Sequence, residues 1–154
     1  MRRKDREITD KKLIDEIIRM CDVIRIGIFD DEFPYIVPMN FGYIADKNIL
    51  YLHCAKIGKK IDLLKKNDHV AFEFDTDLKL EMSGNSCHST MKYKSILGTG
   101  KITFIENIEE KTLALNLIMK HFNPFLKKID FTENIDATAI LRLDMIDISC
   151  KIND

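Results

Sequence analysis

The sequence lacks a long hydrophobic run, an excess of one charge and any close pair of cysteines. No stretch approaches the roughly 20 apolar residues of a membrane-spanning helix, and the N-terminus has no apolar segment typical of a secretory signal. Lysine and arginine total 24 against 25 aspartate and glutamate residues, so the net charge is only −1. This balance argues against nucleic acid as a partner, because nucleic-acid-binding proteins usually carry an overall basic field.

The four cysteines, Cys21, Cys54, Cys87 and Cys150, stand far apart and form no CxxC pair. Structural zinc sites usually show two ligands at short spacing, and Cys87 followed by His88 is too little to predict one. Separated thiols fit a reducing compartment. The sequence therefore predicts a cytoplasmic protein without a metal site.

The chain also lacks internal repeats and any linker rich in proline, glycine or serine. Its 154 residues, 45% of them apolar, are enough for one domain with a substantial core. We therefore expect residues 1–154 to form a single domain.

Apolar residues recur at helical spacing in three segments. The first covers residues 10–20, with Thr9 as its cap, and the second begins after Gly58. The third begins at Asn107, a cap residue with a glutamate three positions on, and ends at Asn123-Pro124. Two alternative sets of residues could form the apolar stripe of this third helix: Leu113, Leu117 and Met119, or Ala114, Ile118 and His121.

Strand-like alternation of apolar residues covers six further segments, which are residues 23–29, 35–44, 49–54, 70–74, 93–105 and 138–148. Residues 75–90 are mostly polar and predict a long loop. Gly98 and Gly100 share one strand face, which suggests a bend or a close approach by another backbone. Because most strands follow one another directly, the pattern favours an antiparallel barrel with flanking helices over a doubly wound sheet.

Two lysines, Lys59 and Lys60, fall in the first turn of the predicted helix after Gly58. Cations are unfavourable there, because the helix dipole is positive at its N-terminus. A phosphate bound in the turn would reverse this effect, since backbone N–H groups, the dipole and two ammonium groups would all attract it. Two interpretations stay open: a phosphate site, to which Lys56 could add charge, or a solvated helix face.

Five other residues could carry chemistry, and a structural alternative stays open for each. Pro38 inside a strand predicts an edge or a bulge, where Asn40 on the same face could meet a planar heterocycle; an edge strand without a ligand is the alternative. His53 is the best candidate for proton transfer, or it is a hydrogen-bonded core residue. Tyr93 and Ser95 share a strand face and could bind a ligand or lie at a dimer contact. No Ser-His-Asp set or carboxylate pair is recognisable from spacing.

Three segments together resemble the motifs of one family: Pro34–Tyr43, Tyr51–Ala55 with Gly58-Lys59-Lys60, and Thr90–Lys101. The family is the pyridoxamine 5′-phosphate oxidase-related FMN-binding flavoproteins. More narrowly, the chain resembles the 5-nitroimidazole resistance (Nim-like) branch, of which the opening Met1–Glu7 is also typical. The resemblance runs nearly end to end, and its three motifs occur in the family's order.

That resemblance implies a six-stranded antiparallel split β-barrel that forms a homodimer, with FMN at the subunit interface. By analogy, the flavin ring lies along one strand and the phosphate lies at the start of the short helix. The implied cofactor-binding residues are Pro38, Met39, Asn40, His53, Cys54, Ala55, Gly58, Lys59, Lys60, Tyr93 and Ser95. His53 matches the family's active-site histidine, whereas Cys54 departs from the small serine or glycine common at its position.

The implied activity is reduction of a small molecule, such as a nitro compound, through FMN, with NADH or NADPH as electron donor. The organic chemistry would belong to the cofactor, while the protein binds, orients and tunes it. Two alternatives stay open: a flavin-binding sensor or storage protein without turnover, and a cofactor-free dimeric barrel. Neither fold nor branch determines the substrate.

Overall fold

The structure is a computed structural model that describes residues 3–84, 89–129, 131 and 135–154. Cys87 and His88 lie outside the described residues, as do Met1 and Arg2. The helices are α1 (Lys11–Met20), α2 (Lys59–Lys66) and α3 (Ile108–Phe122), with 3-10 turns at Lys4–Arg6, Ala45–Lys47 and Ile135–Ala137. The strands are β1 (Glu7–Ile8), β2 (Ile24–Ile28), β3 (Tyr35–Met39), β4 (Phe41–Ile44), β5 (Ile49–Ala55), β6 (His69–Glu81), β7 (Thr90–Ile105) and β8 (Thr138–Asn153).

All eight strands belong to one antiparallel sheet with the order β3-β2-β6-β7-β8-β5-β4, and β1 pairs with the end of β8. The predicted mainly β, antiparallel architecture with three helices is confirmed. The predicted number of six strands is wrong, because the two-residue β1 has no alternation to reveal it and residues 35–44 form two strands.

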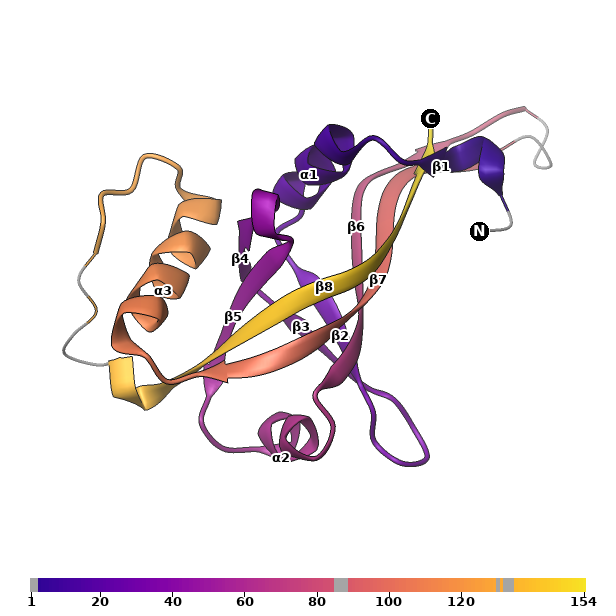
Figure 1. The fold of residues 1–154 in the computed structure, drawn as a ribbon. Helices are drawn as coiled ribbons and strands as arrows, with labels where there is room; N and C mark the ends of the chain where they lie inside the picture. Colours follow the sequence, from indigo (N-terminus) through magenta and orange to yellow (C-terminus); the bar gives the residue numbers. More distant parts are fainter. Residues whose placement is uncertain (1–2, 85–88, 130, 132–134) are drawn as a thin grey trace.

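The sheet turns a corner at Asn40, where the sequence predicts one continuous strand. β3 pairs with β2, whereas β4 pairs with β5, so the two stand at opposite ends of the strand order. Because Asn40 alone joins them, the sheet must curl until its two edges meet at this residue (Figure 1). The Asn40 side chain stabilises the corner by donating a hydrogen bond from Nδ2 to the Asp22 carbonyl over 3.1 Å. Pro38 lies in the edge strand β3, as predicted.

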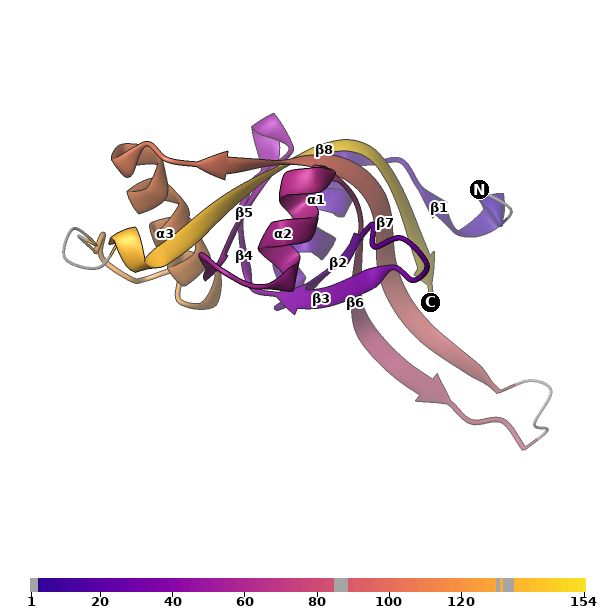
Figure 2. The ribbon, with the colours of Figure 1, turned by 90° about the horizontal axis from the view of Figure 1, so that it is seen from below.

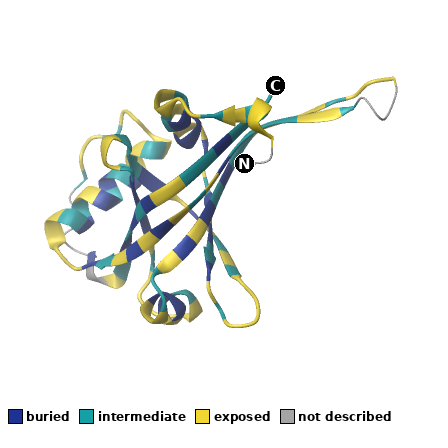
Figure 3. Ribbon diagram, turned by 45° about the vertical axis from the view of Figure 1, so that its right-hand side comes forward, coloured by how far each residue is buried: buried dark blue, intermediate teal, exposed yellow. Residues whose placement is uncertain are grey.

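The curled sheet encloses a main core, and α3 covers a second, smaller one. Alternate residues of β2 and β6 fill the main core together with the apolar face of α1, as the sequence predicts. β5 is buried on both faces: Leu50 and Leu52 point into the main core, whereas Ile49 and Tyr51 pack under α3. Figure 3 shows the resulting alternation of buried and exposed positions along the strands. In Figure 1, α1 and α2 lie near opposite ends of the curled sheet.

A two-stranded arm replaces most of the long loop predicted for residues 75–90. β6 continues to Glu81 and β7 begins at Thr90, and Figure 2 shows the two strands extending away from the body. Most positions between Asp77 and Glu81 are exposed, so the strand lacks the buried alternation that would have revealed it. β8 ends at Asn153 rather than Ile148, because its last residues pair with the first part of β7.

Helices α1 and α3 each begin with a side-chain cap, and the cap of α1 is one residue later than predicted. Asp10, not Thr9, caps α1, and its carboxylate accepts a hydrogen bond from the Lys12 amide over 2.9 Å. Asn107 caps α3 as predicted, with its side chain accepting from the Glu110 amide over 2.8 Å. The buried stripe of α3 includes Ala114 and Ile118, which decides between the two stripes left open by the sequence.

Gly98 and Gly100 lie where other groups approach β7 closely, as the sequence predicts. A Cβ atom at Gly98 would stand 2.2 Å from Phe72 Cζ and 2.5 Å from the Asp147 carbonyl oxygen. A Cβ at Gly100 would stand 2.6 Å from the Asp144 carbonyl oxygen. The β7–β8 register also shifts between Thr99 and Gly100, so the strand bends here.

Candidate functional site

The corner at Asn40 lies against the end of β5, which brings two of the predicted motifs together. In the β4–β5 ladder, Phe41 pairs with Leu52. Asn40 directly precedes Phe41 and His53 directly follows Leu52, so both residues lie next to the end of this ladder. The residues predicted to meet a flavin ring and the predicted catalytic histidine therefore occupy one corner of the sheet, although they are far apart in sequence.

Lys60 reaches the same corner from the first turn of α2. Its Nζ atom lies 3.7 Å from Met39 Sδ. Its charge also acts on the His53 and Cys54 side chains and favours the neutral imidazole and the thiolate. Within the described ranges, no carboxylate lies within ion-pair distance of Lys60 Nζ. The corner therefore holds a half-buried cation that has no carboxylate partner in the part of the chain that the structure describes.

Lys59 is placed differently, so the two lysines are not equivalent. Its Nζ atom forms an ion pair with Asp30 Oδ2 at 2.6 Å and lies 5.1 Å from the centre of the Tyr35 ring. The hydrogen bond to Asp30 raises the pKa of Lys59. Sequence reasoning missed Asp30, because nothing local links an aspartate in the β2–β3 turn to a helix so far along the chain.

The start of α2 is open, as a phosphate site requires. Gly58 has φ 121°, a conformation that side-chain-bearing residues rarely adopt, and it provides no side-chain cap. Its carbonyl accepts hydrogen bonds from the Ile61 and Asp62 amides, whereas amides nearer the helix start need partners from outside the helix. A Cβ atom at Gly58 would meet nothing within 4 Å, so the space over this turn is free. Uncapped amides, a positive helix end and the Lys60 ammonium group suit an anion.

The two side chains at the end of β5 have environments that favour their neutral forms. His53 continues the face of Ile49 and Tyr51 but is exposed, so the alternative of a buried core histidine is wrong. Partial burial of its ring, followed by the charge of Lys60, lowers the pKa of His53. Burial raises the pKa of the half-buried Cys54 thiol, and Lys60 opposes that change. Both groups should therefore be largely neutral near pH 7.

We expect the His53 imidazole to titrate below its ordinary value of about 6.5. Replacing Lys60 with alanine should raise this pKa, because one of its two causes disappears, whereas Lys59→Ala should leave it unchanged. As the pH falls, His53 takes up a proton at a higher pH in the unfolded chain than in the folded protein. His53 should therefore lower the free energy of unfolding below about pH 6.5. NMR titration of the histidine ring protons measures both variants. Equal pKa values in wild type and Lys60→Ala would contradict the placement of Lys60.

Tyr93 and Ser95 lie away from this corner, on the arm. Tyr93 pairs with Asn153, and Ser95 pairs with Lys151 and Asp75. Lys101, further along β7, pairs with His69, which follows α2 closely. The eight residue steps from Tyr93 to Lys101 span roughly 26 Å of strand, and Figure 1 shows the arm and α2 on opposite sides of the molecule. One chain therefore does not bring Tyr93 and Ser95 to the Lys60 corner.

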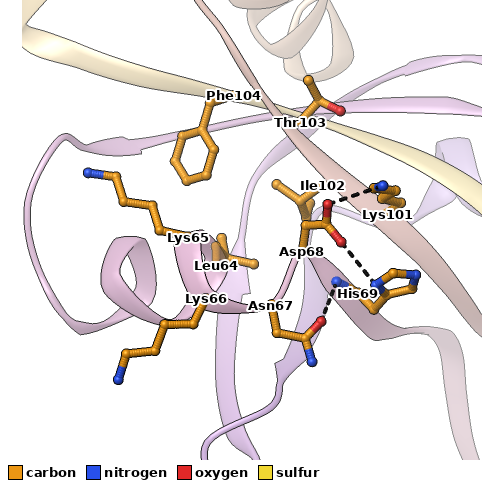
Figure 4. A pocket seen from close by; sticks show the side chains of 10 residues that line it. All are labelled: Leu64, Lys65, Lys66, Asn67, Asp68, His69, Lys101, Ile102, Thr103 and Phe104. Atoms are coloured by element: carbon orange, nitrogen blue, oxygen red, sulfur yellow. Dashed lines mark hydrogen bonds and ion pairs between the residues drawn. The ribbon is translucent and has the colours of Figure 1, made fainter.

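A cavity of about 710 Å³ lies at the other end of α2 and contains none of the predicted site residues (Figure 4). Asp68 in its wall forms an ion pair with Lys101 at 3.3 Å, and its carboxylate lies 2.9 Å from His69 Nδ1. Lys101 in this cavity thus has a carboxylate partner, unlike Lys60.

Two features are absent from the described part of the chain: a helix suited to crossing a membrane and a cluster of metal-binding side chains. None of its helices combines the length and the apolar character needed to cross a membrane. Its histidine, cysteine, aspartate and glutamate side chains form no group of three suited to a metal ion.

Comparison with known proteins identifies the family. Residues 10–152 match the profile of pyridoxamine 5′-phosphate oxidase. A protein from Bacteroides thetaiotaomicron, proposed to be a 5-nitroimidazole antibiotic resistance protein, is 33% identical, with 95% of this chain and 86% of that chain covered and a TM-score of 0.81.

Two more distant structures share the fold. Flavocytochrome Anf3 from Azotobacter vinelandii is 18% identical, with 100% of this chain and 72% of that chain covered and a TM-score of 0.83. The FAD and heme binding protein from Mycobacterium smegmatis is 19% identical, with 97% of this chain and 74% of that chain covered and a TM-score of 0.83. A search of curated proteins found no match. The resemblance drawn from the three motifs, including its Nim-like part, is confirmed, and the chain belongs to the pyridoxamine 5′-phosphate oxidase family.

Proposed function

We propose that the protein binds FMN and uses it to reduce a small molecule. The observation that supports this best is Lys60, a cation without a carboxylate partner among the described residues, held beside Met39 at an uncapped helix start. Family membership and the flavin-binding names of two structural relatives agree with it. Titrating free FMN with protein and following its fluorescence tests the binding step; fluorescence unchanged at high protein concentration would contradict it.

In this proposal the phosphate of FMN lies over Gly58, where Lys60 and the first amides of α2 hold it. Lys59 would contribute its charge if Asp30 released it. Pro38, Met39 and Asn40 would follow the flavin ring, because β3 is an edge strand whose outer polar groups have no strand partner among the described residues. His53, Cys54 and Ala55 at the end of β5 would complete the site.

We further propose that the functional unit is a homodimer. Tyr93 and Ser95 match the family's motif near the flavin cleft, yet in one chain they lie on the far side of the sheet from Lys60. A second copy could supply them to the same cofactor, so that the site would be incomplete in a monomer.

FMN would supply the electron-transfer chemistry, with NADH or NADPH as donor. The protein's own contribution would be to bind and orient the ring and to exchange a proton at His53, which is exposed and whose lowered pKa favours the neutral imidazole. A nitro compound is one candidate substrate, since the Bacteroides thetaiotaomicron relative carries a name that refers to 5-nitroimidazole resistance. The separated cysteines support a cytoplasmic location within this proposal.

We expect His53→Ala to bind FMN as tightly as wild type while losing turnover. Positioned proton transfer typically contributes a factor of about 100 or more, so NAD(P)H-dependent reduction should fall by at least that factor. The measurement is steady-state reduction of a nitroaromatic acceptor, with FMN affinity measured in parallel. His69→Ala is the matched control, because His69 lies in the separate cavity beyond α2.

The outcome also separates the competing functions. Full turnover in His53→Ala would remove its proposed role. Tight FMN binding with no reduction by either nicotinamide in the wild type would favour a flavin-binding sensor or storage protein. A protein that takes up no FMN would favour a cofactor-free barrel.

A further inference from the structure

A second, smaller cavity lies between α2 and the start of α3. It has a volume of about 180 Å³. Four charged residues line it: Lys56, Lys65, Lys111 and Glu106. The rest of its wall is apolar or hydroxylic, with side chains from α2, the end of β7 and the start of β8. Three lysines and one glutamate thus line one small cavity.

We call Lys56, Lys65, Lys111 and Glu106 the lysine pocket. Lys111 is its unusual member. The Lys111 side chain is only 4% exposed, and a buried ammonium group requires close compensation. Its one ion-pair partner among the described residues is Glu106, at 3.3 Å, and that carboxylate is 86% exposed. Lys111 also lies in the first turn of α3, where the helix dipole opposes a cation. Burial and the helix dipole therefore both disfavour this cation, and an anion in addition to Glu106 would stabilise it.

The size of the pocket limits what that anion can be. Sites for drug-sized ligands usually exceed about 300 Å³, whereas a water molecule occupies about 30 Å³. The space is therefore too small for a nucleotide but large enough for one tetrahedral oxyanion. Lysine ammonium groups are common partners of such oxyanions, and three lysines line this cavity.

The lysine pocket is distinct from the Lys60 corner. Ile61 and Lys65 both line it and lie four residues apart on one face of α2. Lys60 points to Met39 instead. Figure 4 shows the Lys65 side chain on the Phe104 side of α2, directed away from Lys66. Two cationic sites thus flank the same short helix on different faces.

We infer that the lysine pocket binds a small tetrahedral oxyanion, with inorganic phosphate as its simplest form. The buried Lys111 ammonium group is its inner contact, and Lys56 and Lys65 close it from the solvent side. This inference is independent of flavin binding, because none of its four residues belongs to the proposed FMN site.

Isothermal titration of the purified protein with sodium phosphate, at constant ionic strength set by chloride, tests this inference. We expect saturable phosphate binding in wild type, with the lysine pocket as one of its sites. Lys111→Met, which keeps the length of the side chain and removes its charge, should weaken phosphate binding at least tenfold. The exposed pair Lys56→Ala/Lys65→Ala should weaken it similarly and keeps the test informative if Lys111→Met does not fold.

Two control variants separate this pocket from its neighbours. Lys60→Ala should retain phosphate binding, which shows that the anion is not in the FMN phosphate site. Lys66→Ala, one residue beyond Lys65 and outside the pocket, should also retain it. Absence of saturable binding in wild type, unchanged affinity in both pocket variants, or loss of binding in Lys60→Ala would each overturn the inference. Since the readout is phosphate rather than FMN, its failure leaves the flavin proposal untouched.

Discussion

Lys60→Ala is expected to weaken FMN binding about 10- to 150-fold. A hydrogen bond to a charged group contributes about 1.5–3 kcal/mol, which corresponds to this range of affinities. The effect of Lys60→Ala should fall within this range, because the Lys60 ammonium group has no carboxylate partner among the described residues. It therefore breaks no ion pair when it binds a phosphate. Fluorescence titration of FMN with each variant gives the affinities directly.

Lys59→Ala provides the matched comparison from the same helical turn. Lys59 must first give up its ion pair with Asp30, so part of its interaction with phosphate is offset. We therefore expect a smaller loss of affinity than for Lys60→Ala, and none for Lys66→Ala at the far end of α2. Equal FMN affinity in Lys60→Ala and wild type would refute the assignment of the phosphate site to the start of α2.

Gly98→Ala is expected to destabilise the fold by about 3 kcal/mol, at the upper end of the usual cost of overpacking. The added methyl group would stand 2.2 Å from Phe72 Cζ and 2.5 Å from the backbone oxygen of Asp147. The Phe72 ring is buried in the main core, and the carbonyl belongs to the neighbouring strand β8, so neither can move freely. For a chain of this size the melting temperature should fall by about 6–12 °C.

Gly84→Ala is the control for this substitution. A Cβ atom at Gly84 would meet nothing within 4 Å, and this glycine lies at the outer end of the arm. Its effect on unfolding should stay within about 0.5 kcal/mol. Thermal unfolding followed by circular dichroism compares the two variants. If both lowered the melting temperature equally, the close packing at Gly98 would not be the cause.

Most of the sheet could be predicted from periodicity, because alternate residues of β2 and β6 face one core. The corner at Asn40 could not be predicted, since alternation continues from Tyr35 to Tyr43 while the hydrogen-bonding partner changes from β2 to β5. The arm was missed for the opposite reason: exposed on both faces, it has the polar composition of a loop.

The candidate site shows the same division between local and long-range information. Lys59 and Lys60 were recognisable as anomalous from their position in one helical turn. Their difference depends on Asp30 and Met39, which only the folded chain brings near. Lys111 carried the same local anomaly, a lysine in the first turn of a helix, but its burial depends on the packing of α3 against the sheet.

The visible absorption spectrum of the purified protein tests the central claim most directly, measured before and after adding FMN and removing the excess. We expect the visible absorption bands of bound flavin to remain with the wild-type protein, and to be lost or much weaker in Lys60→Ala. A wild-type protein that stays colourless after FMN is supplied would contradict the proposed function.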